Sequence, residues 1–415
     1  MITARAFSGK HYAVYGLARS GLATVEALLA SGARVTAWDA KEEARATAPT
    51  GADVADLDEV KLGGFDSLIV TPGLPLNRHP IAQRARDAGV EIIGDIELFA
   101  RARAELPPHK VVGITGTNGK STTTALVHHI LQTAGIPTTM GGNIGLPILA
   151  QDPLPEGGVY VLELSSYQLD LTQSLDCDVA VLLNITPDHL DRYENFEAYA
   201  ASKRRLFALS RGAKFDSTCA PAKAGAQSGS LPSQGHNQAD WPTLQGPHNE
   251  QNATAAIAVC KQLGLSDEAI EHGLRTYPGL PHRMERVREK DGVIFVNDSK
   301  ATNPTATAPA LAAFDKIRWI LGGQAKTDNL DECAPHFGHV RSAYTIGEAA
   351  ELFERLLSPH MPVKNCGELG AAVRAAAADA ASGDTVLLSP ASASFDQFKD
   401  FEARGDAFRT AVGAL

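Results

Sequence analysis

A glycine-rich turn at residues 116–121, with the sequence GTNGKS, has the composition of a phosphate-binding loop. It follows an apolar run at residues 110–114 and opens a helical pattern at residues 120–134. Glycines let backbone N–H groups face an anion, and a helix N-terminus favours negative charge. We therefore expect Lys120 to contact the terminal phosphates of a nucleotide and the Ser121 hydroxyl to reach Mg²⁺.

This loop departs from the common G-x-x-x-x-G-K-[ST] pattern, because Ile114 stands five positions before Gly119. The plain alternative is a glycine turn followed by a serine that caps the helix. The strand–loop–helix setting favours nucleotide binding over that alternative.

A second glycine turn, at residues 16–21, resembles a dinucleotide fingerprint in which one glycine is replaced. Asp39 lies 18 residues after Gly21, where a ribose-binding acid is expected. Ligand binding and a simple tight turn are equally supported here. A nicotinamide-dependent dehydrogenase is therefore a rival, although it would leave the loop at residues 116–121 unexplained.

Two further residues follow buried strand patterns. Glu163 ends the apolar run at residues 159–162, and His189 follows the run at residues 179–185. Ligands gather beyond the carboxyl ends of strands in an open parallel sheet, so both residues should share a rim with the phosphate loop. A carboxylate with Ser121 and phosphate oxygens is a reasonable Mg²⁺ shell, whereas a histidine ligand to Mg²⁺ is less usual.

Several of these polar residues also have plainer interpretations. Taken alone, His189 suits a hydrogen-bonded loop histidine, and Asp188, Asp191 and Arg192 suit a solvated ion-pair cluster. Lys203, taken alone, is typical of a helix surface.

Polar groups also cluster at residues 281–283 and 297–303, where a strand pattern ends. Such clusters are more often functional than polar runs elsewhere, although capping would also explain Asp298 and Ser299.

The elements that would position these residues alternate between strand and helix patterns, which predicts a mainly parallel α/β fold. A length of 415 residues suggests about three domains, and Pro107-Pro108 breaks the chain before a fresh strand. We place the domains at residues 1–108, 109–280 and 281–415. Residues 214–245 show no periodicity, and we expect a long irregular loop there.

Composition excludes some classes of protein. The formal net charge is −10 without a basic stripe, so we expect no nucleic-acid partner. The five cysteines are odd in number and form no CxxC motif, which indicates a reducing compartment. No signal peptide and no apolar stretch of about 18 residues is present, so we expect a cytoplasmic protein without a membrane partner.

Together, the segments resemble the Mur ligase family of ATP-dependent amide-forming ligases over nearly the whole chain. The family's phosphate loop and metal-site segments are matched by residues 116–121, 163–168 (ELSSYQ) and 188–192 (DHLDR). Its D-glutamate-adding branch is matched best by residues 280–283 (LPHR), 297–303 (NDSKATN) and 389–398 (SPASASFDQF). The resemblance implies a Rossmann-like N-terminal domain, a P-loop ATPase-like central domain and a Rossmann-like C-terminal domain.

The resemblance also implies an activity, a peptidoglycan-precursor ligase that joins D-glutamate to UDP-N-acetylmuramoyl-L-alanine. It implies ATP and two Mg²⁺ ions as cofactors and a monomeric protein. Lys203 falls where the family has a carbamylated lysine. The matching catalytic positions are Lys120, Glu163, His189 and Lys203, and the matching metal positions are Ser121, Glu163, His189 and Lys203.

Three binding sets follow from the same resemblance. The ATP set is Gly116, Thr117, Asn118, Gly119, Lys120, Ser121, Thr122, Asn249, Asn252, Arg283, Asp298 and Lys300. The UDP-substrate set is Ser20, Asp39, Thr71, Pro72, Gly73, Asn143 and Gln168. The acceptor set is Thr302, Lys326, Ser394, Phe395 and Phe401.

Two other activities remain open beside the dehydrogenase. One is a sister ligase, such as a folylpolyglutamate synthase or another amino-acid-adding Mur enzyme, against which residues 298–303 and 389–398 argue. The other is a non-catalytic nucleotide-binding regulator. The sequence does not show directly whether D- or L-glutamate is preferred, and residues 214–245 replace what the family usually builds as strands and turns.

Overall fold

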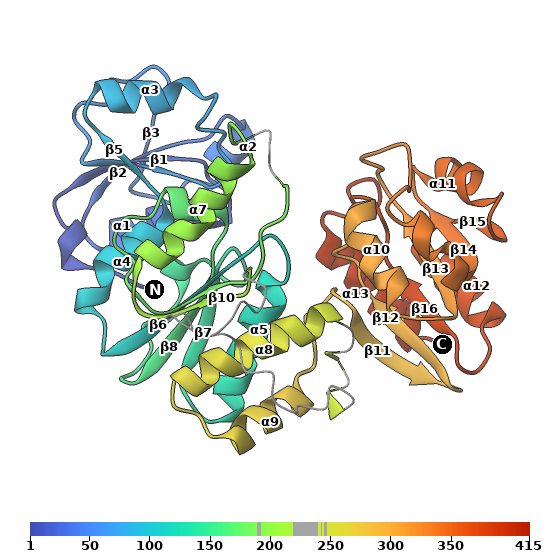
Figure 1. The fold of residues 1–415 in the computed structure, drawn as a ribbon. Helices are drawn as coiled ribbons and strands as arrows, with labels where there is room; N and C mark the ends of the chain where they lie inside the picture. Colours follow the sequence, from blue (N-terminus) through green and yellow to red (C-terminus); the bar gives the residue numbers. More distant parts are fainter. Residues whose placement is uncertain (189–191, 219–239, 242, 245–246) are drawn as a thin grey trace. The chain divides into compact units, whose positions relative to one another are not determined.

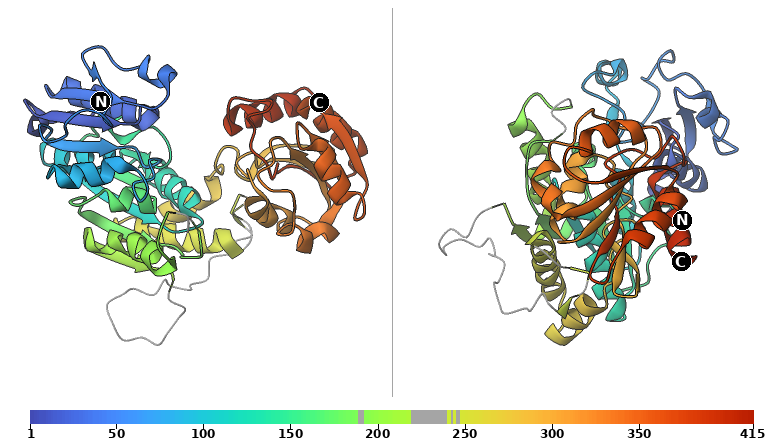
Figure 2. Two further views of the ribbon diagram at one scale, coloured as in Figure 1. Left: turned by 90° about the horizontal axis from the view of Figure 1, so that it is seen from above. Right: turned by 90° about the vertical axis from the view of Figure 1, so that its right-hand side faces the viewer.

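The computed structural model describes residues 1–188, 192–218, 240–241, 243–244 and 247–415 (Figure 1). The chain divides into two compact units, Met1–Asn237 with Pro247–Thr276, and Gln238–Gly246 with Tyr277–Leu415. The first unit holds two five-stranded sheets, and the second holds one six-stranded sheet. The expected α/β fold with three successive sheets is confirmed (Figure 2).

The first sheet is parallel, with the strand order β3-β2-β1-β4-β5. The strand β4 is buried along its whole length, as expected for a parallel sheet covered on both faces. Because β1, β2 and β4 end side by side, the glycine turn at residues 16–21, Asp39 and Thr71 lie at one edge. The elements are β1 (His11–Tyr15), α1 (Arg19–Ala30), β2 (Arg34–Trp38), α2 (Glu42–Arg45), β3 (Asp53–Val54), β4 (Ser67–Val70), α3 (Pro80–Asp87), β5 (Glu91–Ile93) and α4 (Asp95–Ala102).

The second sheet is also parallel, with the order β10-β9-β6-β8-β7. Its central strand β6 leads into the glycine loop, and the neighbouring β8 ends at Glu163, so both lie at the same edge. The elements are β6 (His109–Thr115), α5 (Lys120–Thr133), β7 (Thr138–Gly142), β8 (Gly158–Glu163), α6 (Ser166–Asp170), β9 (Cys177–Leu182), α7 (Phe196–Ala208), β10 (Ser210–Asp216), α8 (Pro247–Gln262) and α9 (Asp267–Thr276).

The first two sheets share one hydrophobic core. Val14 and Val35 of the first sheet belong to the same buried cluster as Leu162 of the second sheet and Leu206 of α7. Phe99 of α4 and Tyr160 of β8 meet edge to face within it, with ring centroids 5.0 Å apart. This continuous core explains why the two sheets form a single compact unit.

The second unit contains a mostly parallel sheet with the order β11-β12-β16-β13-β14-β15. Only β11 runs antiparallel to its described neighbour. The elements are β11 (Glu285–Lys290), β12 (Val293–Asn297), α10 (Pro304–Ala312), β13 (Ile317–Gly322), β14 (Val340–Ile346), α11 (Ala350–Leu357), β15 (Val363–Gly367), α12 (Leu369–Asp379), β16 (Thr385–Leu388) and α13 (Phe401–Gly413).

The prediction of an irregular loop at residues 214–245 is wrong for its first three residues. Lys214, Phe215 and Asp216 complete β10, because they pair in parallel with residues 180–182 of β9. Trp241, near the other end of this segment, is buried. Residues 219–239, 242 and 245 lie outside the described residues. The expected loop therefore starts after β10.

Among the helices described, none combines the length and the apolar character needed to span a membrane.

Candidate active site

The glycine loop connects β6 to the first turn of α5, as the sequence predicts. Gly119 adopts φ of +82°, a left-handed conformation that suits glycine, and it caps α5. The Lys120 ammonium donates hydrogen bonds to the carbonyl oxygens of Gly116 and Thr117, both at 2.9 Å. The Asn118 N–H points back toward the protein, where Asn184 Oδ1 accepts it at 2.8 Å. The loop backbone therefore folds around the Lys120 ammonium.

Helix α8 contributes a buried asparagine to this loop. Asn252 Oδ1 accepts a hydrogen bond from Thr123 Oγ1 at 3.3 Å, and Asn252 Nδ2 donates to Asn249 Oδ1 at 3.3 Å. A Cβ placed on Gly119 would lie 2.2 Å from Asn252 Oδ1. The structure therefore brings Asn249 and Asn252 beside the phosphate loop, although Asn252 follows Thr123 by 129 residues in the sequence.

We expect Gly119→Ala to disrupt this contact, and Gly135→Ala provides a matched control. Both glycines have positive φ, but around Gly135 nothing in the described structure lies within 4 Å of an added Cβ. Gly135→Ala should cost only the left-handed strain of about 1–2 kcal/mol in the free energy of unfolding. Gly119→Ala must also displace Asn252, so ATP affinity measured by calorimetry should fall at least about tenfold. Equal ATP affinity in the two variants would contradict this role for Gly119.

Glu163, at the end of β8, is buried and has one oxygen without a partner. Its Oε1 accepts a hydrogen bond from Asn143 Nδ2 at 3.0 Å. Its Oε2 is buried and has no hydrogen-bond partner in the described structure. An unpaired buried carboxylate oxygen is costly unless a cation meets it. Together with the buried Ser121 hydroxyl on the first turn of α5, this donor chemistry fits Mg²⁺.

His189, the other expected metal residue, lies outside the described residues. Within the described ranges, no three His, Cys, Asp or Glu side chains form a metal cluster. Thr122, the last residue of the expected loop set, is half-buried next to Ser121 on α5.

Lys203 on α7 is buried, so its interpretation as a surface lysine is wrong. Its ammonium donates to the Gly116 carbonyl at 2.8 Å and lies 4.7 Å from the centroid of the Tyr199 ring. Burial, together with the nearby Lys120 ammonium, lowers the pKa of Lys203 to about 7. Near neutral pH a substantial fraction of Lys203 is therefore a neutral amine, beside the phosphate loop.

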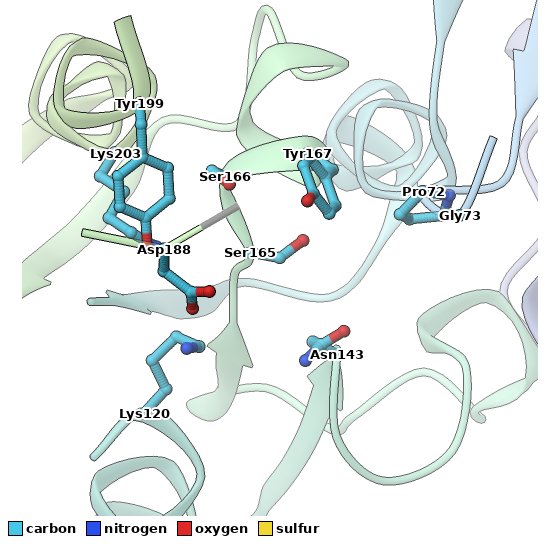
Figure 3. Close-up of a pocket in the computed structure, with 10 residues that line it drawn as sticks. All are labelled: Pro72, Gly73, Lys120, Asn143, Ser165, Ser166, Tyr167, Asp188, Tyr199 and Lys203. Atoms are coloured by element: carbon cyan, nitrogen blue, oxygen red, sulfur yellow. The ribbon is translucent and has the colours of Figure 1, made fainter. Parts of the chain in front are cut away.

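Lys120, Asn143 and Lys203 line a cavity of about 310 Å³ (Figure 3). Figure 3 shows the Asp188 carboxylate and the Lys120 ammonium facing one another, with Pro72 and Gly73 on the far side of the space. The residues gathered here follow strands of both sheets of the first unit or lie on the helices α5, α6 and α7. The lining residues are Pro72, Gly73, Lys120, Asn143, Ser165, Ser166, Tyr167, Asp188, Tyr199 and Lys203.

Asp39 and Gln168, two expected UDP-substrate residues, make local structural contacts. The Asp39 carboxylate accepts the backbone N–H groups of Leu17 at 2.8 Å and Lys41 at 2.9 Å. Gln168 Oε1 accepts the N–H and O–H of Ser165, which completes a capping box on α6. These contacts shape the turns at the edges of the two sheets.

Ser20 and Thr71 line a second, small cavity of about 10 Å³ at the edge of the first sheet. A Cβ on Gly16 would lie 2.3 Å from Thr71 Oγ1, which explains a glycine there. Buried Asp95 also lines this cavity, and burial raises its pKa to about 6.

In the second unit, Asp298 follows β12 and is buried. Its carboxylate accepts Ser389 Oγ–H at 2.7 Å and the Met284 N–H at 3.2 Å. Burial raises the pKa of Asp298 to about 7, while the positive charge of Arg283 and the Ser389 hydrogen bond oppose that rise. The Lys300 N–H donates to the carbonyl of His282 at 2.9 Å, which keeps these strand-end residues together.

The expected acceptor residues lie in the same unit, in loops that follow strands and at the start of α13. Lys326 Nζ donates to Thr302 Oγ1 at 3.3 Å, and the Lys300 ammonium lies 5.7 Å from the centroid of the Phe401 ring. Ser394 is buried, whereas 69% of the Phe395 side chain is exposed. The structure thus pairs Thr302 with Lys326 and leaves the Phe395 ring on the surface.

Sequence reasoning missed the buried Arg404 of α13. Its guanidinium donates to the carbonyl oxygens of Ser299, Ser392 and Ala393 at 2.9, 3.0 and 3.2 Å. Burial lowers its pKa to about 10, which leaves the group charged near neutral pH. No local pattern distinguishes this arginine from a surface residue, because all three partners come from other elements.

Models of three protein domains match the chain. They are a Mur ligase MurD-like N-terminal domain over residues 10–94, a Mur ligase middle domain over residues 114–220, and a Mur ligase glutamate ligase domain over residues 282–392.

Two curated proteins named UDP-N-acetylmuramoylalanine–D-glutamate ligase are each 60% identical to the chain. They come from Novosphingobium aromaticivorans and Sphingopyxis alaskensis, and the alignments cover 100% of this chain and 97% and 100% of theirs. The solved structure of a UDP-N-acetylmuramate-alanine ligase from Thermotoga maritima is similar in fold. It has a TM-score of 0.58 at 16% identity, covering 98% of this chain and 99% of that one.

Proposed function

Because the chain belongs to the Mur ligase family, we propose that it is an ATP-dependent ligase that joins D-glutamate to UDP-N-acetylmuramoyl-L-alanine. The observation that carries this proposal is the 60% identity, over the full length, to two proteins named for that reaction. The enzyme would act as a cytoplasmic monomer in peptidoglycan precursor synthesis.

The proposed chemistry activates a carboxylate. The terminal carboxylate of UDP-N-acetylmuramoyl-L-alanine attacks the γ-phosphorus of ATP, which gives an acyl phosphate and ADP. The free amine of glutamate then attacks the acyl carbon, and the tetrahedral intermediate loses phosphate to leave an amide. Two anions must approach each other in the first step, so positive charge at the meeting point lowers the barrier. Lys120 supplies such a charge within the cavity of the first unit.

We further propose that two Mg²⁺ ions are held by Ser121, Glu163, His189 and a carbamylated Lys203. The unpaired Glu163 Oε2 supports this assignment, because it offers an unused anionic ligand. When bound, Mg²⁺ neutralises the phosphoryl oxygens as nucleophile and phosphate meet.

Carbamylation of Lys203 requires only the amine and CO₂, and no second enzyme. The neutral amine adds to the carbon of CO₂ and releases one proton, so that a neutral group becomes an anionic carbamate. The lowered pKa of Lys203 supports this step, because the protonated amine has no lone pair for the attack. An anion at this position would also complete the metal shell around Glu163.

We assign the remaining expected residues to the three substrates, and we keep the domain boundaries at residues 1–108, 109–280 and 281–415. ATP is assigned to the loop residues with Asn249, Asn252, Arg283, Asp298 and Lys300. The UDP-sugar donor is assigned to Ser20, Asp39, Thr71, Pro72, Gly73, Asn143 and Gln168. D-glutamate is assigned to Thr302, Lys326, Ser394, Phe395 and Phe401.

A coupled phosphate-release assay tests the proposed function. We expect phosphate only when ATP, UDP-N-acetylmuramoyl-L-alanine and D-glutamate are all present, and mass spectrometry should detect the amide product. The same assay with L-glutamate tests stereochemistry, and we expect little or no product.

Other results of that assay would contradict the proposal. Phosphate release with a folate and glutamate would favour the sister ligase. An absorbance change with NADH in place of phosphate release would favour the dehydrogenase. Nucleotide binding without any turnover would favour a regulator.

A further inference from the structure

Arg192, just before α7, binds a backbone segment of the other sheet in the first unit. Its guanidinium donates to three consecutive carbonyl oxygens, those of Leu74 at 2.8 Å, Gly73 at 3.3 Å and Pro72 at 3.4 Å. The partners are about 120 residues away in sequence. The alternative interpretation of Arg192 was a solvated ion-pair cluster, whereas its described hydrogen bonds go to carbonyls.

The same guanidinium also lies on an aromatic ring. Its central carbon is 4.3 Å from the centroid of the Tyr167 ring. The Tyr193 ring also stacks with Tyr167, with centroids 6.0 Å apart and an interplanar angle of 10°. Tyr193 contacts the ring of Tyr199, with centroids 5.5 Å apart. Ring stacking therefore fixes the plane from which Arg192 reaches the carbonyls.

These contacts concern the cavity directly. Pro72, Gly73 and Tyr167 line it, and all three contact Arg192 (Figure 3 shows them at one side). Nothing in the described structure lies within 4 Å of a Cβ built on Gly73. Side-chain packing at Gly73 therefore does not hold this wall. The Leu74 N–H donates to the Thr71 carbonyl at 3.0 Å, and the three hydrogen bonds from Arg192 add a restraint from outside the segment.

We propose that Arg192 is a positioning residue for the UDP-sugar donor, which fixes residues 72–74 as one wall of the cavity. This inference rests on the proposed function. A lysine would keep the charge but could not bond three carbonyls while stacking on Tyr167, because its ammonium is compact rather than planar. The requirement is therefore for the shape of the guanidinium and not for its charge alone.

The test compares Arg192→Lys and Arg192→Met with Arg84→Lys. Arg84 on α3 bonds two carbonyls of the first sheet's domain, those of Leu57 at 2.7 Å and Val60 at 2.6 Å, and it does not line the cavity. Steady-state kinetics would give KM for each substrate, and calorimetry would give Kd for the donor alone. Thermal melting would compare the folding of all three variants.

For both Arg192 variants we expect donor KM and Kd to rise about tenfold or more, since charged hydrogen bonds that fix the wall are lost. The KM values for ATP and D-glutamate should change less than about threefold. Arg84→Lys should lower the melting temperature comparably and leave donor Kd unchanged. Donor Kd within about twofold of wild type in Arg192→Lys, or equal rises for all three substrates, would overturn the proposal. Absence of turnover in the wild type would instead contradict the proposed function.

Discussion

Lys120→Ala is expected to lower kcat by at least about a thousandfold while leaving the fold intact. The Lys120 ammonium sits at the start of α5, bound to the Gly116 and Thr117 carbonyls, and lines the cavity. Removing it takes away positive charge where the two anions meet. Alanine is the best helix former, so α5 should persist.

The same substitution should act on a second residue. The Lys120 charge helps to lower the pKa of Lys203, so its removal should raise that pKa and reduce the fraction of neutral amine. Lys110→Ala is the matched control, because Lys110 is an exposed lysine on the neighbouring β6. Circular dichroism checks the fold, and phosphate release checks turnover. Normal turnover by well-folded Lys120→Ala would show that the loop does not serve the reaction.

Lys203→Ala is expected to lose nearly all activity, at least about a hundredfold, and to regain part of it with short carboxylic acids such as formate or acetate. The removed side chain leaves space beside Gly116, and a free carboxylate can take the place of the carbamate there. Lys203→Arg should be inactive without rescue, because its side chain fills the site and forms no stable carbamate. Arg204→Ala, at the adjacent exposed position, should behave as wild type.

Carbon dioxide and pH give independent readouts of the same group. Activity of the wild type should fall when CO₂ is stripped from the buffer. The dependence on CO₂ should be stronger at pH 6 than at pH 8, because a group of pKa about 7 is mostly protonated at pH 6 and cannot attack. If neither added carboxylates nor CO₂ changed the rates, the carbamate proposal would be wrong.

The sequence predicted the apolar framework closely. The expected strands at residues 110–114 and 159–162 lie within β6 and β8. Their apolar, β-branched runs carry the signal by themselves. The strands β10 (SRGAKFD) and β11 (ERVREK) were not predicted, because both are polar and rely on a neighbouring strand for their pairing.

The position of a candidate site residue could be predicted where it follows from a local motif. Lys120 and Glu163 lie beside the end of a strand, so topology alone places them at one edge. Lys203 could not be placed from its own helix, because the contact that buries it is with Gly116, 87 residues away. The hydrogen-bond partners of Arg192 and Arg404 could not be inferred for the same reason, since both bind carbonyls of distant segments.

The core shared by the first two sheets has a consequence for tolerance of mutation. Phe99 and Tyr160 belong to one buried cluster. The cavity wall at residues 72–74 and the phosphate loop should therefore unfold in a single cooperative transition. A destabilising substitution in the first sheet therefore lowers the free energy of unfolding of the whole first unit. A second destabilising substitution, around Lys120, would then unfold the unit more readily. Substitutions in Tyr277–Leu415 fall in a separate compact unit and should combine with those in the first unit more nearly additively.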